Sequence, residues 1–540
     1  MQKNEHYEIE ITALGKDAEG IGRLDGFTFF VENALPGDCV EMRIVKLKKS
    51  YGYGKLIRIV RPSANRVEPR CPVFARCGGC TLQHMAYEPQ LGIKTRLVAD
   101  ALTRIGGITN PNVAPTLGMA VPFAYRNKAQ YPIREINGRP AAGFFSARSH
   151  TLVPVTDCCI AQPSNSALLQ IILSFMEEYK ITCYNEKSHE GLVRHVLIRS
   201  ALHTGEIMVC LVVNGKKLPY GDVLAAMLAA YPGVASIILN SNRVRSNVIL
   251  GDTYQTLWEQ PYITDTIGGL RFNISPQSFF QVNPLQTQTL YETALTLAEV
   301  RFTDTVIDVF CGIGTLSLFF ARHVKAVVGI EIIEQAIEDA KQNALANGIT
   351  NTTFMAARAE DAMPALVRDG LTPDIVVLDP PRKGCEPPVL AAIAAMAPRT
   401  VVYVSCDPAT LARDLALLIA EGYTVCAVQP VDMFPQTGHV ETVVLLSKLK
   451  STTSIEVKID LDEMDLTKSE SKATYDEIKT YVLDKYGFKV SQLYIAQVKR
   501  KHGIIERENY NTGEGKAKVP QVPADKEKAI EDALKHFRMI

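Results

Sequence analysis

Between residues 271 and 450 the sequence alternates short apolar runs with segments of helical length, and this alternation limits the possible folds more than any other feature of the chain. The apolar runs are VIDVF, AVVGIE, TTFMAA, DIVVLD, TVVYVS, YTVCAV and TVVLLS. Strands that are buried on both faces read as continuous runs of this kind, because helices cover both sides of a mostly parallel sheet. The pattern therefore predicts an α/β domain over residues 271–450.

The rest of the chain lacks this rhythm, and 540 residues are too many for one ordinary hydrophobic core. Residues 1–60 form short strand-like pieces broken by glycine-rich turns, which indicates a small antiparallel β-barrel. Residues 61–270 mix strand-like and helical segments, so we expect a central α+β domain there. Residues 451–540 begin with a charged stretch and then show helical periodicity, and we interpret them as an appendage of unknown role.

The composition is typical of a soluble globular protein, with 47% hydrophobic and 21% charged residues. No apolar run is long enough to cross a bilayer, and the N-terminal sequence lacks the basic start and apolar stretch of a secretory signal. We therefore expect a cytoplasmic protein with no membrane partner. In that compartment the 12 cysteines are expected to be reduced thiols, metal ligands or catalysts rather than disulfides.

The net charge gives no global attraction to nucleic acid, because 58 Lys and Arg residues balance 58 Asp and Glu residues. A site for a polyanion must therefore come from local clusters. One such cluster places Lys46, Lys48 and Lys49 beside Tyr51 and Tyr53, a combination that suits phosphate contacts and stacking on bases. A solvated strand edge explains the same residues equally well.

Glycines follow the first apolar run of the α/β region, where residues 308–314 read DVFCGIG. Glycines at the carboxyl end of a first strand let the backbone approach a ligand closely. The second strand ends in Glu331, a carboxylate placed to accept both ribose hydroxyls of a nucleoside. Ser317 stands where the dinucleotide pattern G-x-G-x-x-G needs its last glycine, which disfavours a pyrophosphate ligand. A plain tight turn is the alternative.

The fourth run ends in Asp379, followed by the sequence PPRKG. A carboxylate and two rigid prolines at the carboxyl end of a strand fix a loop over the cleft. Methyltransferases that act on exocyclic amines carry a similar motif that ends in an aromatic residue, which stacks on the base. Here Arg382 takes that place. The departure favours a carbon atom over an amine as the methyl acceptor.

Cys406, in the sequence SCDP, follows the next strand, and Glu441, in GHVE, begins the last one. Carbon 5 of uracil is too weak a nucleophile to take a methyl group unaided, so a thiolate must first add to carbon 6. A base must then remove the proton from carbon 5 to release the enzyme. A lone cysteine is more often an inert buried residue. The position of Cys406 at the active edge of the sheet favours the catalytic role.

The central region holds the triplet Cys71-x5-Cys77-x2-Cys80 and the distant pair Cys158-Cys159. Three closely spaced thiols and one from afar can complete a tetrahedral zinc site or hold an iron–sulfur cluster. Radical S-adenosylmethionine enzymes use a tighter C-x3-C-x2-C triplet and leave one iron open, so this spacing disfavours their chemistry. Unliganded thiols are the alternative.

Taken together with FFQVN at residues 279–283, these motifs resemble the RNA uracil-5-methyltransferase family, in particular the branch that acts on 23S ribosomal RNA. The resemblance spans residues 5–449. It implies a multidomain α/β fold: an N-terminal TRAM barrel of OB-like type, a central mixed α+β domain and a Rossmann-like class I S-adenosylmethionine methyltransferase domain. It also implies that residues 82–112 pack with the catalytic domain.

The resemblance assigns roles to the motif residues one by one. Cys406 would be the nucleophile and Glu441 the base that removes the proton. The S-adenosylmethionine ligands it implies are Gln281, Phe310, Glu331 and Asp379, with Asp361 as a contact on the adenine side.

The resemblance also implies a [4Fe-4S] cluster held by Cys71, Cys77, Cys80 and one of the adjacent pair. Cys158 is chosen because the last ligand of the family lies five residues before a proline, and Pro163 fits that spacing. Cys159 is the alternative.

We therefore expect an enzyme that methylates carbon 5 of a specific uridine in 23S ribosomal RNA through a covalent cysteine adduct. Ribosomal RNA is the expected partner, and no obligate protein partner is evident. A transfer RNA uridine-5-methyltransferase is one alternative, although such enzymes typically lack the barrel and the cysteine cluster. A non-catalytic iron–sulfur RNA-binding protein is the other, and the intact Cys406, Glu441 and Asp379 speak against it. The sequence does not specify which uridine is methylated or how many.

Overall fold

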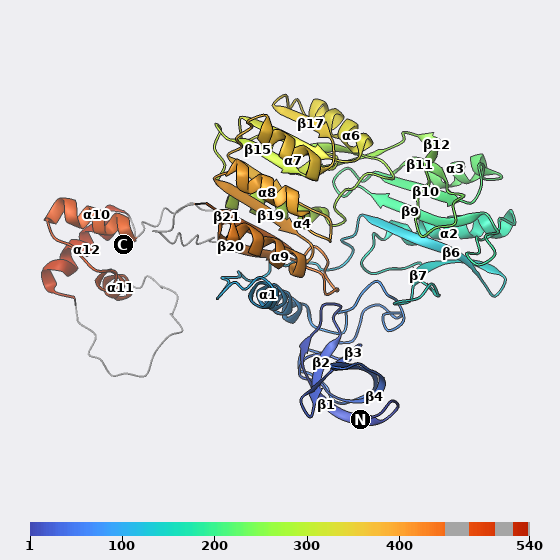
Figure 1. The fold of residues 1–540 in the computed structure, drawn as a ribbon, viewed down its shortest axis with the longest axis horizontal. Helices are drawn as coiled ribbons and strands as arrows, with labels where there is room; N and C mark the ends of the chain where they lie inside the picture. Colours follow the sequence, from blue (N-terminus) through green and yellow to red (C-terminus); the bar gives the residue numbers. More distant parts are fainter. Residues whose placement is uncertain (449–474, 503–521, 538–540) are drawn as a thin grey trace. The chain divides into compact units, whose positions relative to one another are not determined.

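The computed structural model describes residues 1–448, 475–502 and 522–537 (Figure 1). The chain divides into two compact units, Met1–Ile455 and Glu456–Ile540. No helix within the described ranges is long and apolar enough to cross a membrane.

The N-terminal strands close into a five-stranded barrel in the order β1-β2-β3-β5-β4. Alternate residues of these strands point inward around Phe29 and Met42, as period-two patterning requires. A Cβ atom at Gly54 would collide with Met42, so a glycine is needed where the barrel wall approaches its core. The strands are β1 (His6–Leu14), β2 (Gly20–Leu24), β3 (Phe27–Val31), β4 (Cys39–Leu47) and β5 (Tyr51–Arg61).

The central region contains a seven-stranded sheet in the order β12-β11-β10-β9-β6-β7-β8. One face packs on two helices through Leu168, Ile172 and Leu224. Met208 and Ile238 on the opposite face join the core of the α/β domain, so the two domains share buried surface. The elements are β6 (Lys128–Ile136), β7 (Arg139–Phe145), β8 (Leu152–Pro154), α2 (Ser164–Glu178), β9 (Val193–Ser200), β10 (Ile207–Val213), α3 (Gly221–Ala229), β11 (Val234–Ser241) and β12 (Thr253–Glu259).

The α/β domain is built on a second seven-stranded sheet, in the order β17-β16-β15-β18-β19-β21-β20. All its strands are parallel except β21, which runs antiparallel to both neighbours. The seven apolar runs of the sequence are these strands, and the predicted fold class is confirmed. They are β15 (Thr305–Val309), β16 (Ala326–Glu331), β17 (Thr352–Ala356), β18 (Ile375–Leu378), β19 (Thr400–Ser405), β20 (Thr424–Val431) and β21 (Glu441–Ser447).

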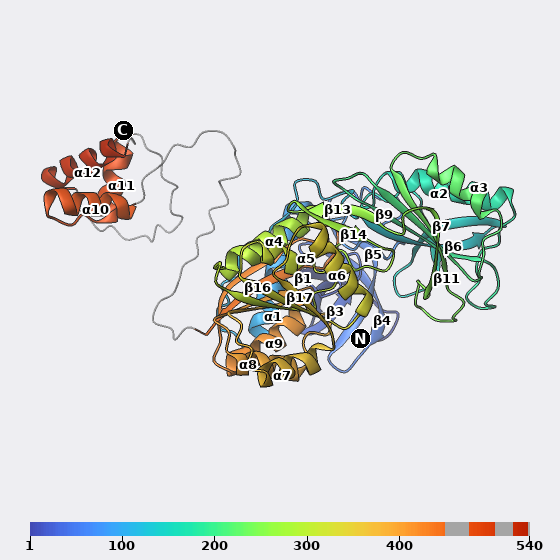
Figure 2. The ribbon, with the colours of Figure 1, turned by 90° about the horizontal axis from the view of Figure 1, so that it is seen from above.

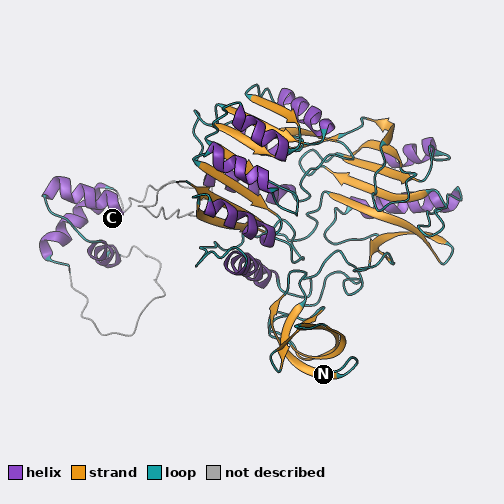
Figure 3. Ribbon diagram, in the orientation of Figure 1, coloured by secondary structure: helices purple, strands orange, loops and turns teal. Residues whose placement is uncertain are grey.

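Helices cover both faces of this sheet, α4 to α6 on one side and α7 to α9 on the other (Figure 2). Figure 3 shows the resulting layers of strand between helices. The hairpin of β13 (Ile263–Ile267) and β14 (Leu270–Ile274) precedes them. The helices are α4 (Pro284–Ala298), α5 (Thr315–Ala321), α6 (Glu334–Ala346), α7 (Ala359–Arg368), α8 (Pro387–Met396) and α9 (Pro408–Ala420).

Helix α1 (Tyr87–Arg104) lies between the barrel and the central sheet in sequence, but it packs against α9 of the α/β domain. Its Val98 and Leu102 are fully buried in one cluster with Leu411 and Leu415. The chain therefore crosses to the α/β domain, contributes one helix to it and returns to build the central sheet.

The second unit is described through three helices that surround a small apolar core of their own. Ile478, Val482, Ile495, Ile530 and Leu534 are buried in it. The helices are α10 (Tyr475–Tyr486), α11 (Gln492–Lys501) and α12 (Ala524–His536).

Candidate active site

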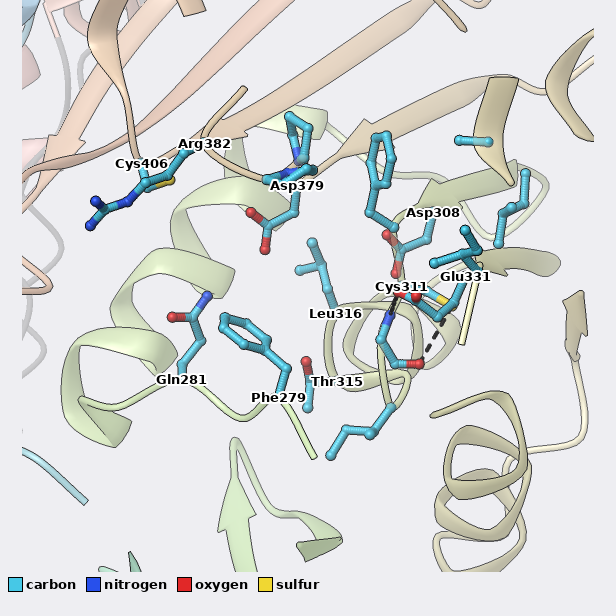
Figure 4. A pocket seen from close by; sticks show the side chains of 18 of the residues that line it. Phe279, Gln281, Asp308, Cys311, Thr315, Leu316, Glu331, Asp379, Arg382 and Cys406 are labelled. Carbon is cyan, nitrogen blue, oxygen red and sulfur yellow. Dashed lines mark hydrogen bonds between the residues drawn. The ribbon is translucent and has the colours of Figure 1, made fainter. Parts of the chain in front are cut away.

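A cavity of about 750 Å³ opens where the parallel strands of the α/β domain end (Figure 4). Loops that follow the carboxyl ends of neighbouring strands meet at one edge of such a sheet, which is where ligands bind in folds of this class. Six of the seven catalytic and S-adenosylmethionine-contacting residues predicted from the sequence line the cavity: Gln281, Phe310, Glu331, Asp379, Cys406 and Glu441.

The loop after β15 adopts a backbone that most residues avoid. Phe310 has φ +73°, Gly312 +56° and Gly314 +82°, all in the left-handed region. The amide groups of Phe310 and Cys311 both donate to the carbonyl of Ile330, at 2.9 Å each. A non-glycine residue held in this region marks a loop whose shape is fixed by its surroundings. The loop of residues 310–314 thus presents its backbone to the cavity in a pre-formed shape, and we call it the β15 cradle.

Glu331 ends β16 beside this cradle. Its Oε2 accepts a hydrogen bond from the Gly312 amide at 3.2 Å, and its Oε1 accepts one from the Ile333 amide at 3.0 Å. These two bonds fix the carboxylate and leave further lone pairs directed to the pocket. The group can therefore accept hydrogen bonds from two neighbouring hydroxyls of a ligand.

Asp308 lies beneath the cradle and was given no separate role from the sequence. Its Oδ2 accepts a hydrogen bond from the Ser317 hydroxyl at 2.5 Å, and its Oδ1 has no partner within the described residues. Burial raises the pKa of Asp308 to about 6. A buried acceptor without a donor is costly, so it favours a ligand that brings one or carries positive charge.

Asp379 and Glu441 place two more carboxyl groups on the wall of the cavity. Burial, followed by the negative charge of Asp308, raises the pKa of Asp379 to about 7. Burial, followed by Asp379, raises the pKa of Glu441 to about 8, and Arg382 opposes that rise. Carboxyl groups with strongly raised pKa values in a cleft are candidates for proton transfer near neutral pH.

Cys406 is half-buried at the carboxyl end of β19. Ser405 pairs with Thr442 across the antiparallel β19–β21 ladder. Cys406 comes directly after Ser405 and Glu441 directly before Thr442, so the two residues lie at adjacent strand ends. Burial, Glu441 and Asp379 raise the pKa of the Cys406 thiol to about 12, against the opposing charge of Arg382. Arg382 and Cys406 both line the pocket, and Figure 4 shows them toward the same end of it. The thiol is therefore protonated near neutral pH until a further positive charge, in addition to that of Arg382, offsets the carboxylates.

Two family models match this chain: tRNA (Uracil-5-)-methyltransferase over residues 256–449 and TRAM domain over residues 2–57. A Clostridium tetani protein, named only as an RNA methyltransferase, is 46% identical over 448 residues, or 83% of this chain and 97% of that protein. A Halalkalibacterium halodurans RNA methyltransferase is 46% identical over 447 residues, or 83% of this chain and 98% of that protein. The chain belongs to the RNA uracil-5-methyltransferase family.

A solved structure has the same architecture over most of the chain. The Pyrococcus abyssi tRNA (uracil-54, C5)-methyltransferase, in complex with S-adenosyl-L-homocysteine, aligns with a TM-score of 0.66 and 29% identity. The alignment covers 81% of this chain and 99% of that one. This RNA uracil-5-methyltransferase is accordingly an S-adenosylmethionine-dependent enzyme whose N-terminal barrel is a TRAM domain.

In this uracil-5-methyltransferase, one carboxylate that lines the cavity was not singled out by the sequence motifs. Within residues 1–448, Glu360 rather than Asp361 lines the cavity. Asp361 is 74% exposed and lies 3.7 Å from Arg358. Both residues are in the first turn of α7, and the phase of the helix turns the first of them inward. The carboxylate of this turn that lines the cavity is therefore Glu360.

The cavity also contains residues that the sequence motifs did not single out. Arg126 reaches it from the segment before β6, in the central region, and Phe279 lines it although its side chain is 68% exposed. Phe434 and His439 come from the loop between β20 and β21. An arginine and exposed aromatic rings at the mouth of a methyltransferase pocket suit an unstacked nucleotide. The GHVE motif was the signal for His439, and no comparable signal marked Arg126.

Five of the seven cysteines of the central region interact with one another: Cys71, Cys77, Cys80, Cys158 and Cys159. After the larger effect of burial, the charge of Cys158 raises the pKa of the Cys77 and Cys80 thiols, and the charge of Cys71 raises the pKa of the Cys158 thiol. Cys159 instead accepts a hydrogen bond from the side-chain amide of Gln83 at 3.3 Å. In the described parts of the chain, no three His, Cys, Asp or Glu side chains form a group that could hold a single metal ion.

Proposed function

We propose that this protein methylates carbon 5 of a uridine in 23S ribosomal RNA, with Cys406 as nucleophile and Glu441 as base. The observation that carries the proposal is the placement of these two side chains at adjacent ends of β19 and β21, facing the pocket that the β15 cradle also lines. A cysteine and a carboxyl group with a raised pKa, on one side of a methyl-donor site, are the two groups that this chemistry requires.

The residues of the cradle fit the methyl donor. The backbone around Gly312 is open, since a Cβ atom there would meet nothing within 4 Å, and Glu331 offers lone pairs to two ribose hydroxyls. S-adenosylmethionine supplies an electrophilic methyl group on a positively charged sulfur. The carboxyl groups of Asp308 and Asp379 suit that charge, and the positive charge would in turn lower the pKa of the Cys406 thiol.

In the proposed mechanism the Cys406 thiolate adds to carbon 6 of uracil, and the electron pair of the carbon 5–carbon 6 double bond moves to form an enolate. Carbon 5 then takes the methyl group, and the donor leaves as a neutral thioether. Glu441 removes the proton from carbon 5, the double bond forms again, and the bond from carbon 6 to sulfur breaks to return the thiolate. The base must first leave its stack to reach the pocket, so a loop or an opened helix is the expected substrate.

The TRAM barrel supports an RNA substrate of some size. Lys46, Lys48 and Lys49 are exposed on it, and Tyr51 and Tyr53 lie edge to face with ring centroids 5.6 Å apart. Exposed lysines beside aromatic rings contact phosphates and bases. A ribosomal substrate would place the enzyme in the cytoplasm.

Transfer RNA is a second candidate substrate, and one observation favours it. The Pyrococcus abyssi tRNA (uracil-54, C5)-methyltransferase aligns with 81% of this chain, which is far more than the catalytic domain alone. A multidomain architecture of this kind therefore does not distinguish the two substrates. Methyl transfer to unmodified 23S ribosomal RNA and to unmodified transfer RNA, measured side by side, decides between them. Methylation of transfer RNA alone would overturn the ribosomal assignment.

We also propose that Cys71, Cys77, Cys80 and Cys158 hold a [4Fe-4S] cluster. Cys158 interacts with each member of the triplet, whereas Cys159 interacts with Cys71 and Cys80 and accepts a hydrogen bond from Gln83. A cluster separates its thiolates more widely than a single ion does, which is compatible with thiols that do not converge on one point. Anaerobically purified protein should be brown and contain iron. Zinc in place of iron would contradict the proposal.

The covalent step is tested with RNA that carries 5-fluorouridine at the target, because fluorine cannot leave as a proton. A methylated protein–RNA complex should then survive denaturing electrophoresis, and Cys406→Ala should abolish both the complex and turnover. If Cys406→Ala still methylates carbon 5, the mechanism is wrong.

A further inference from the structure

The loop of residues 432–439, between β20 and β21, supplies Phe434 and His439 to the cavity and ends two residues before Glu441. Asp432 and Gln436 of this loop are buried. Gln436 has φ +69°, a left-handed conformation that is strained for a residue with a side chain. Such strain persists only where the surrounding structure holds it in place. The contacts of the loop show what holds it.

Side chains on one face of α1 form hydrogen bonds with the start of the loop. The Tyr87 hydroxyl donates to Asp432 Oδ2 at 2.8 Å, and Lys94 Nζ donates to Asp432 Oδ1 at 2.5 Å and to the carbonyl of Phe434 at 3.1 Å. Lys94 and Asp432 are both fully buried. A buried ion pair contributes little net stability but is costly to break, so it specifies one arrangement of the loop.

Gln90, on the same face of α1, joins the loop to the segment that follows Cys80. Its Nε2 donates to the Leu82 carbonyl at 3.1 Å, to the Met85 carbonyl at 2.9 Å and to Gln436 Oε1 at 3.1 Å. Its Oε1 accepts from the Gln436 amide at 3.2 Å. Gln90 is fully buried, so water cannot replace these partners.

The segment after Cys80 also holds the loop directly. The amides of Thr81 and Leu82 donate to the Gln436 carbonyl at 3.0 and 2.9 Å, and the Gly438 amide donates to the Thr81 hydroxyl at 3.1 Å. Gln436 is thus hydrogen-bonded through its backbone amide, its carbonyl and its side chain to residues more than 300 positions earlier in the sequence.

We propose that Gln90 and Gln436 are positioning residues that hold the 432–439 loop against the pocket and thereby set the rate at which Glu441 resolves the methylated adduct. The inference rests on the proposed function. Glu441 is the first residue of β21 and pairs with Val431 at the last rung of the β20–β21 ladder, directly where the loop begins. Cys406 is fixed separately, by β19 and by the N-cap of α9. A freed loop therefore disturbs the base before it disturbs the nucleophile.

The test separates adduct formation from adduct resolution in single-turnover reactions with ordinary substrate RNA. Gln90→Leu removes the partners of the Gln436 amide, the Gln436 side-chain oxygen and the Met85 carbonyl, whereas the Leu82 carbonyl still accepts from the Met85 amide at 3.0 Å. It is expected to slow release of methylated RNA about tenfold, because unpaired buried polar groups destabilise the loop that positions the base. Adduct formation should change less than about twofold. The covalent complex should therefore accumulate on denaturing gels, as it should more strongly for Glu441→Gln.

Gln436→Gly is the second variant, because glycine adopts φ +69° without strain and keeps the backbone bonds to Thr81 and Leu82. It should show the same selective accumulation to a smaller extent. Gln170→Leu is the matched control: it makes the same chemical change on the exposed side of α2 and should behave as wild type. Equal slowing of formation and release in both Gln90→Leu and Gln436→Gly, or normal release in both, would overturn the inference.

Trapping of the wild-type protein on 5-fluorouridine RNA distinguishes a failure of the proposed function from a failure of this inference. Wild-type protein that forms no complex with 5-fluorouridine RNA would overturn the proposed function and this inference with it. Wild-type protein that is trapped normally, with variants that release product at the wild-type rate, would overturn the inference alone.

Discussion

Asp379 and Glu441 face the same cavity, and the negative charge of Asp379 adds to burial in raising the pKa of Glu441 to about 8. Glu441 must be ionised to take a proton from carbon 5. The rate of adduct resolution should therefore rise with pH below about 8 and level off above it. Single-turnover release of methylated RNA, measured from about pH 6 to about pH 9, checks this. A release rate that is flat over that range would exclude Glu441 as the base.

The same pKa predicts an effect on stability. The folded pKa of Glu441 lies above its unfolded value of 4.5, so the folded state keeps a proton that the unfolded state has lost. The contribution of this group to the free energy of unfolding is fully present below about pH 4.5 and is lost as the pH rises through about 8. Glu441→Gln cannot ionise, so it should exceed wild type in stability at high pH, by roughly 5 kcal/mol, and match it in acid.

Thermal midpoints of wild type and Glu441→Gln, compared across pH, test that expectation. Glu441 is 4% exposed, whereas Glu292 on α4 is exposed, so Glu292→Gln serves as the control and should show no such trend. A catalytic variant that is more stable than wild type reflects the cost of keeping a carboxyl group buried for function. Parallel stability curves for wild type and Glu441→Gln would contradict the raised pKa.

Arg382 is a cation of the pocket, and its charge opposes the rise that burial, Glu441 and Asp379 cause in the pKa of the Cys406 thiol, which lies at about 12. Arg382→Met should therefore slow adduct formation by about tenfold or more and shift its pH dependence to the alkaline side. Trapping on 5-fluorouridine RNA as a function of pH provides the measurement. Arg368→Met, at the exposed end of α7, makes the same change away from the cavity and should leave the profile in place.

The main elements of the fold and much of the site follow from the sequence for a physical reason. Strands buried on both faces must be continuously apolar, so β15 to β21 stand out, and the residues that follow such strands must share one edge of the sheet. Asp379 immediately follows β18 and Cys406 immediately follows β19. Their common pocket therefore follows from topology alone.

The remaining contacts depend on packing between distant segments, which has no local signal. Arg126 reaches the cavity from another domain, and Lys94 is fully buried although a lysine in a helix normally indicates a solvated face. The choice between Asp361 and Glu360 depends on the helical phase of α7, which differs by about 100° between neighbouring residues. Sequence patterns locate such a helix more reliably than they fix its rotation.

Lys16 and Asp407 connect the barrel to the catalytic domain: Lys16 Nζ lies 2.6 Å from Asp407 Oδ2. Asp407 follows Cys406 and caps α9, where its Oδ1 accepts from the amides of Ala409 at 2.9 Å and Thr410 at 3.2 Å. Lys16 thus offsets a negative charge next to the nucleophile. The other charged or titratable groups around Cys406 are Glu441, Asp379, Arg382 and His439.

Lys16→Met leaves the Asp407 charge without its partner, which should raise the thiol pKa and slow adduct formation about two- to threefold, a small effect because Lys16 is 70% exposed. Asp407→Asn keeps an oxygen that can cap α9 but removes the charge, so Lys16→Met should have no further effect in that background. The rate of adduct formation is measured as a function of pH in wild type, both single variants and the double variant. These four proteins form a double-mutant cycle. Lys48→Met, elsewhere on the barrel, controls for the loss of a lysine. Additive effects of the two substitutions would show that the ion pair does not act on Cys406.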